Sequence, residues 1–160
     1  MKYLLIIFFI FTYFSAPAQN YTLPDGEYMD TTSNNTTTCK DHDTYYYQVG
    51  GKYPKSSSTL LKEVQLFLQV NHEVYTGSGY ITFRFQIDCE GKMMQKVQVL
   101  QTDNSYLVSH FNKTLVNELF TFLKSLDKWK IAKAKNGETF PYRAFLTFKI
   151  NNGKVINIIP

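Results

Sequence analysis

The fold is decided by the stretch Gly79-Tyr80-Ile81-Thr82-Phe83-Arg84-Phe85-Gln86-Ile87-Asp88. Apolar and polar side chains alternate along it, which is the period-two pattern of a strand with one buried face. Glu90-Gly91 follows as a turn, because glycine adopts positive φ without steric cost. A second strand is predicted over residues 94–102, so the two strands should form an antiparallel hairpin.

The same alternation returns near the C-terminus, over residues 143–150. The segment Asn151-Asn152-Gly153-Lys154 then predicts a tight hairpin turn, because Asn-Gly tolerates the positive φ that a type I′ turn requires. An apolar segment over residues 155–159 completes the hairpin. We expect it to pair with the 143–150 strand and to cover one edge of that strand.

Two segments carry the helical spacing of three and four residues. The first covers about residues 59–70 and can be capped by Ser56-Ser57-Ser58, whose hydroxyls accept the first free N–H groups. The second stripe runs from Val108 to Leu126, with Asn104 or Ser105 as the expected N-cap. Helix, strand, strand, helix, strand, strand predicts an α+β two-layer sandwich, with an antiparallel sheet of three to four strands packed against two helices.

Residues 1–18 have the pattern of a signal peptide. Lys2 precedes the apolar segment Tyr3–Phe14, and Ala16-Pro17-Ala18 supplies the small residues before a cleavage site after Ala18. An uncleaved anchor is the alternative, but a spanning helix needs about 20 apolar residues. The sequence thus predicts a periplasmic or secreted protein without a membrane span after cleavage. Removal of Lys2 lowers the formal net charge from +4 to +3, which is too small to imply a nucleic-acid or membrane-surface partner.

Residues 19–52 form a polar, Tyr- and Thr-rich extension from which no core can be built. Export makes disulfides possible, and Cys39 and Cys89 are the two cysteines of the chain. We expect them to form a disulfide, which would stabilise the fold by roughly 4 kcal/mol through its loop of about 50 residues. Two unpaired thiols, or an intermolecular bond, are the alternatives.

Residues 53–150 resemble the C-terminal domain of TonB, in the form found in exported proteins of Bacteroidetes-type bacteria. The matching segments, in order, are Tyr53-Pro54, Gly79 to Asp88, Glu90-Gly91-Lys92, Val97-Gln98-Val99-Leu100, Lys128-Trp129-Lys130, Asn136-Gly137-Glu138 and Phe145 to Phe148. The resemblance implies that residues 53–160 are a recognition domain; the long Pro-rich spacer of TonB itself is lacking, since the chain has five Pro. It implies binding of short segments of outer-membrane transporters by strand addition to a sheet edge.

The residues expected to contact such a peptide are Phe145, Thr147 and Lys149, provided that the outer edge of their strand is open. Otherwise the rim of the 94–102 strand is the expected site. The 155–159 segment would then compete with the incoming peptide or replace it. A structural protein that forms a homodimer through the same edge is the alternative function.

Other chemistry is weakly supported by the sequence. Cys39, Asp41, His42 and Asp43 could contribute to a zinc site, but a second ligand pair with suitable spacing is lacking, so we expect no metal and no cofactor. A Cys–His nucleophile pair has no local support, and the chain has no Gly-x-Ser-x-Gly motif, so we do not expect an enzyme. A basic run surrounds Trp129, and we interpret it as a solvated loop rather than a nucleic-acid site; it comprises Lys124, Lys128, Lys130, Lys133 and Lys135.

Overall fold

The computed structural model describes residues 27–29, 39, 44–70, 73–94 and 96–160. The predicted signal peptide lies outside these residues. The elements in chain order are β1 (Glu27–Met29), α1 (Ser57–Gln69), β2 (Gly79–Ile87), β3 (Val97–Asp103), α2 (Lys113–Lys124), β4 (Ala132–Lys133), β5 (Thr139–Phe140), β6 (Tyr142–Asn151) and β7 (Lys154–Ile159). Neither described helix is long and apolar enough to cross a bilayer.

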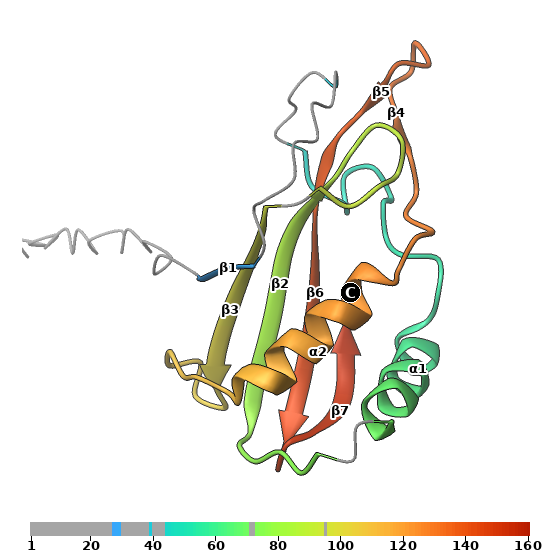
Figure 1. Cartoon of the computed structure of the whole chain (residues 1–160). Helices are drawn as coiled ribbons and strands as arrows, with labels where there is room; N and C mark the ends of the chain where they lie inside the picture. The colour runs from blue at the N-terminus through green and yellow to red at the C-terminus, as the bar shows by residue number, and fades with distance from the viewer. Residues whose placement is uncertain (1–26, 30–38, 40–43, 71–72, 95) are drawn as a thin grey trace, which may run out of the picture.

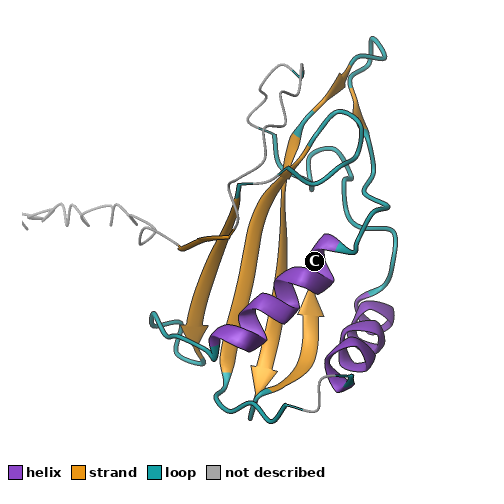
Figure 2. Ribbon diagram, in the orientation of Figure 1, coloured by secondary structure: helices purple, strands orange, loops and turns teal. Residues whose placement is uncertain are grey.

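The main sheet has the strand order β1-β3-β2-β6-β7, and every neighbouring pair is antiparallel (Figure 1). The two helices lie on one side of this sheet, with α2 crossing it and α1 beside β7 (Figure 2). Phe67 of α1 contacts Phe122 of α2, with ring centroids 5.8 Å apart. The α+β two-layer architecture expected from the sequence is therefore confirmed.

The sheet is wider than the three to four predicted strands, because β1 comes from the polar extension. An edge strand is held mainly by main-chain hydrogen bonds, so a segment without an apolar pattern can supply one. Part of the same extension contacts β6, where Arg143 N donates to Thr44 O and Tyr46 N donates to Arg143 O. The boundary placed at residue 52 therefore does not separate the extension from the sheet.

The central hairpin matches its sequence pattern closely. Ile81, Phe83 and Ile87 are fully buried beneath the helices, whereas the intervening side chains lie on the opposite, open face of the sheet. Phe83 pairs with Val99 of β3 and with Leu146 of β6. The core thus forms where the apolar faces of β2, β3 and β6 meet the helices.

The predicted N-cap of α2, Asn104 or Ser105, is wrong by about two turns. Asn112 is the N-cap and accepts a hydrogen bond from Thr114 N at 2.8 Å. The preceding residues form a turn instead, because the Asp103 carboxylate accepts hydrogen bonds from Ser105 N and Leu107 N. Val108 therefore pairs with Thr102 outside the helix and is exposed.

The first helix begins where the serine cap predicts. Ser56 Oγ accepts a hydrogen bond from Thr59 N at 3.1 Å, and Leu60 and Val64 are fully buried. Gln65 Nε2 donates to Val155 O at 2.9 Å, so α1 lies along β7. The helix therefore shelters this end of the sheet.

Trp129 fills the end of the core beyond α2. Its ring meets Tyr53 and Phe85 edge-on, with centroids 4.8 and 5.1 Å away, and 7% of the residue is exposed. The indole N–H is buried without a hydrogen-bond partner among the described residues. Packing rather than polar contact therefore holds this side chain.

The expected disulfide between Cys39 and Cys89 is present, with Cα atoms 6.0 Å apart. Cys89 lies in the turn between β2 and β3. This turn is fixed by Asp88, whose Oδ1 accepts hydrogen bonds from Glu90 N and Lys92 N, both at 2.8 Å. The disulfide thereby attaches the N-terminal extension to the sheet about ten residues after β1.

Candidate functional site at the β3 edge

The three predicted binding residues lie in β6, which is an inner strand. Thr147 pairs with Thr82 on one side and with Ile159 on the other, and Lys149 pairs with Tyr80 and Asn157. The condition for strand addition, an open outer edge, is not met at Thr147 and Lys149, because both residues pair with β7. Val155 and Ile158 of β7 are each 1% exposed, so β7 belongs to the core.

The side chains of these three residues remain accessible from the open face of the sheet. The Phe145 ring stacks on Tyr45 with centroids 6.1 Å apart, and Arg84 lies 5.8 Å from the Phe145 centroid. Lys149 Nζ is 5.8 Å from the centroid of Tyr80. These contacts organise the side chains of β6 on the open face of the sheet.

The rim of β3 is the remaining sequence-predicted edge. Near its end, Gln101 O accepts a hydrogen bond from Ser109 N, and Asp103 N donates to Leu107 O. Odd-numbered residues of β3 thus direct their main-chain groups away from β2, because this direction alternates along a strand. The loop after β3 covers one half of the edge, and the half around Val97 and Val99 faces β1.

The strand β1 occupies that second half with three residues. Glu27 pairs with Val99, Tyr28 with Gln98 and Met29 with Val97. Figure 1 shows β1 at the margin of the sheet, beside β3. Cross-strand pairs contribute only about 0.2–1 kcal/mol each, so a strand of this length is held weakly.

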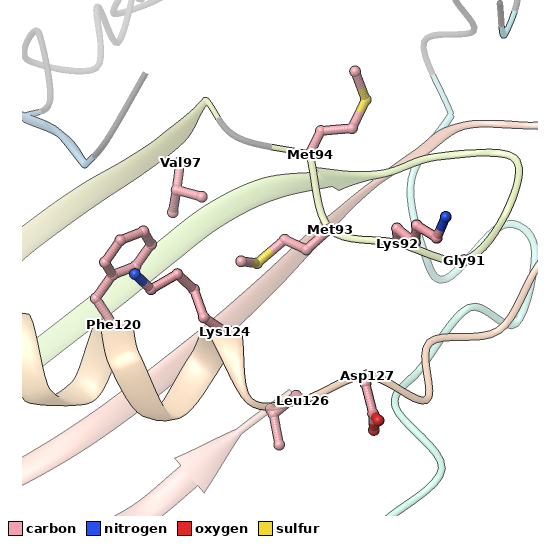
Figure 3. A pocket seen from close by; sticks show the side chains of 9 residues that line it. All are labelled: Gly91, Lys92, Met93, Met94, Val97, Phe120, Lys124, Leu126 and Asp127. Carbon is pink, nitrogen blue, oxygen red and sulfur yellow. The ribbon is translucent and has the colours of Figure 1, made fainter. Parts of the chain in front are cut away.

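Two hollows lie on the helix side of this edge. A volume of about 610 Å³ separates β1 from the start of α2; it is lined by Glu27, Tyr28, Met29, Gln101, His110, Phe111, Lys113, Val116 and Asn117. A second, of about 370 Å³, lies toward the turn between β2 and β3. Figure 3 shows Met93, Val97 and Phe120 directed into this second hollow. Lys124 lies at the rim of this hollow, and its Nζ is 4.7 Å from the Phe120 ring centroid.

A third hollow, of about 310 Å³, lies around the same edge and takes in side chains of the open face. Its lining residues include cations and amides; they are Tyr28, Arg84, Phe85, Gln86, Lys96, Gln98 and Arg143. No carboxylate belongs to this described lining. Since side chains of an extended peptide alternate between faces, hollows on both faces of one edge match the shape of an added strand.

Sequence reasoning identified the rim of β3 but missed β1. A three-residue strand is too short for period-two alternation to be recognised, and the surrounding Ser/Asn/Thr composition indicates a loop. The one available signal is Tyr28-Met29, an apolar pair in a polar extension. Its partner strand lies about 70 residues away, so local patterning cannot reveal the pairing.

The four residues considered for a zinc site are only partly among those that the structure describes. Asp41, His42 and Asp43 lie outside the described residues, while the sulfur of Cys39 is bonded to Cys89. Among the residues that the structure covers, no group of three or more His, Cys, Asp or Glu side chains could hold a metal ion. The basic run from Lys124 to Lys135 has exposed lysines, in agreement with its interpretation as a solvated segment.

Comparisons with protein-family models, with curated proteins and with solved structures found no match. The resemblance to the TonB C-terminal domain therefore remains a prediction from the sequence.

Proposed function

We propose that this protein is an exported peptide-binding module that accepts an extended segment of a partner protein along the edge of β3. The observation that supports this function is the pairing of β1, a three-residue strand from a distant segment, with Val97–Val99. In this proposal β1 is a resident strand that occupies the edge until a partner displaces it. No cofactor and no catalytic step are part of this function.

The energetic basis is the difference between a short and a longer strand. β1 ends at Met29, which is opposite Val97, beside the hollow that contains Met93 and Phe120. A longer peptide in the same register would continue past Met29 and place a side chain in that hollow. Each fully buried large apolar side chain contributes about 1.5–3 kcal/mol, which is enough to favour a partner over β1.

The partner class follows from the resemblance to the TonB C-terminal domain and from the predicted signal peptide. Both suggest a periplasmic location and a segment of an outer-membrane transporter as the bound peptide. Strand addition would then link this protein to transport across the outer membrane. The peptide main chain would supply most of the affinity, since exposed strand edges present unpaired N–H and C=O groups.

The test uses the chain from residue 19 onward with Met29→Pro. Proline removes the N–H that Met29 directs toward β3, so β1 should detach. Hydrogen exchange is then measured at the Val97 and Val99 amides, with and without a synthetic peptide that copies residues 24–33. We expect the substitution to abolish protection and the peptide to restore it, and synthetic transporter segments test the proposed partner class.

Tyr28→Pro is the matched control. The Tyr28 N–H points away from β3, because Glu27 and Met29 face it, so this proline should disturb the pairing much less. A peptide that leaves both amides unprotected in the Met29→Pro variant would show that the edge does not accept an added strand.

Self-association is a second candidate function, favoured by the opposite edge of the sheet. Ile156 and Ile159 of β7 are 43% and 48% exposed, which places apolar surface on an edge strand. Light scattering on the peptide-free protein discriminates between the two functions. A stable dimer that Ile156→Lys disrupts would support assembly through β7, whereas a monomer would leave peptide binding at β3 as the function.

A further inference from the structure

The surroundings of the resident strand β1 indicate which side chains a partner peptide would carry in its place. Its three side chains meet three chemically different environments at the β3 edge, and each environment selects a kind of side chain. This inference rests on the proposed function, because it concerns the sequence of the added peptide.

The first environment surrounds Glu27, opposite Val99. Gln101 Nε2 donates to Glu27 Oε2 at 3.2 Å, and His110 Nδ1 lies 3.8 Å from Glu27 Oε1. Lys113 lines the same hollow. The side chains around this position are thus a donor amide, an imidazole and an ammonium group, which together complement a carboxylate.

The second environment surrounds Tyr28, opposite Gln98 on the other face. Lys96 Nζ lies 5.0 Å from the centroid of the Tyr28 ring, within the range of a cation–π contact. Arg84 and Gln98 line the same hollow. An aromatic ring therefore suits this position, whereas a cationic side chain would meet like charge.

The third environment surrounds Met29, opposite Val97 and packed against the core. It lies between two hollows on the helix side, one lined by Val116 and the other by Met93 and Phe120. A long, unbranched apolar side chain can pack against Val116, Met93 and Phe120 here. A charged or short polar side chain would not make these contacts.

We infer that the partner segment carries an acidic, an aromatic and a long apolar residue in succession, in the register of Glu27-Tyr28-Met29. Alternation places the acidic and apolar side chains on the helix face and the aromatic one on the open face. The same main-chain pairing would serve any sequence, so these three side chains are what distinguishes one peptide from another.

The experiment measures binding of synthetic peptides to the Met29→Pro variant. The reference peptide copies residues 24–33, and three others replace the position of Glu27 by Lys, of Tyr28 by Ser or of Met29 by Ser. We expect each change to weaken binding by at least about fivefold, because each removes roughly 1 kcal/mol of side-chain interaction.

A charge exchange identifies the carboxylate contact. Lys113→Glu in the protein should weaken binding of the reference peptide and strengthen binding of the peptide with Lys at the Glu27 position. Lys62→Glu is the control, because it makes the same charge change on α1, which lies at the other edge of the sheet. Only Lys113→Glu should reverse the order of the two peptides.

The full chain offers a second measurement that needs no added peptide. Glu27→Lys should increase hydrogen exchange at Val97 and Val99 about fivefold, because β1 then opens more often. If all four peptides protect these amides with equal affinity, the inference about sequence is overturned while strand addition stands. If no peptide protects them, the proposed function itself fails.

Discussion

At the scale of single residues, the buried polar side chains of Asp88 and Tyr142 are hydrogen-bonded to main-chain groups of neighbouring irregular segments. Asp88 is 3% exposed, and its carboxylate accepts two main-chain N–H groups of the turn that follows β2. Tyr142 is fully buried in β6, and its hydroxyl lies 2.7 Å from Lys130 O and 3.2 Å from Gly51 O. These hydrogen bonds hold segments without regular structure against the sheet. Losing them would cost about 1–3 kcal/mol, because a buried polar group would then lack a partner.

Tyr142 also makes the free energy of unfolding depend on pH in the alkaline range. Burial raises the pKa of Tyr142 to about 12, from an ordinary value of 10.0. The folded state disfavours the phenolate. The contribution of neutral Tyr142 to the free energy of unfolding is therefore complete below pH 10 and is lost as the pH rises through about 12. The free energy of unfolding, measured in denaturant as a function of pH, should fall by roughly 1–3 kcal/mol in that window.

Tyr142→Phe provides the control for this pH effect. The variant should lose about 1 kcal/mol at neutral pH through its missing hydrogen bond, but it should show a smaller decrease between pH 10 and 12. Burial also raises the pKa of Tyr53, so part of the alkaline decrease should persist. An identical pH profile for both proteins would contradict the role assigned to Tyr142.

At the scale of secondary-structure elements, the hairpin of β6 and β7 combines a local and a tertiary requirement. Asn152 and Gly153 have φ of 47° and 72°, as expected for an Asn-Gly turn. A Cβ on Gly153 would in addition lie 2.0 Å from Tyr75 O. The glycine is therefore needed both for its backbone conformation and for close packing of the turn against the Tyr75–Thr76 backbone.

Gly153→Ala should therefore lower the free energy of unfolding by more than about 2 kcal/mol. Asn152→Gly is the matched control, because it relieves positive φ at the neighbouring position and should change stability by less than about 1 kcal/mol. Denaturant midpoints of both variants test this. Equal midpoints would mean that the turn can move away from Tyr75 without cost.

At the scale of the whole molecule, the disulfide joins the N-terminal extension to the sheet. The bond closes a segment with a sequence separation of 50. Replacing both Cys39 and Cys89 by Ser should lower the free energy of unfolding by about 2–5 kcal/mol, mainly because the unfolded chain gains conformational entropy without the cross-link. The wild-type protein should lose the same amount when a dithiol reduces it, and the double variant should not respond to the dithiol. A reduced wild-type protein of unchanged stability would contradict this role.

The sequence by itself determined the elements whose signals are local. Alternation along residues 79–88 defined β2, the serines before α1 defined its start, and Asn152-Gly153 defined the last hairpin. These signals work because side-chain burial and backbone φ act within a few residues of each position. The start of α2 was misplaced because Asp103 caps a competing turn, whose existence depends on where β3 ends.

Only the tertiary structure decided which sheet edge is available. The sequence predicted that β7 covers one edge of β6, but only the structure shows that β2 pairs with the other edge and that β1 pairs with β3 from about 70 residues away. Edge pairing depends on main-chain groups that every residue except proline carries, so the residue pattern of a short edge strand gives only a weak signal. The candidate site could therefore be narrowed to a sheet edge from the sequence, but its position required knowledge of which strands lie side by side.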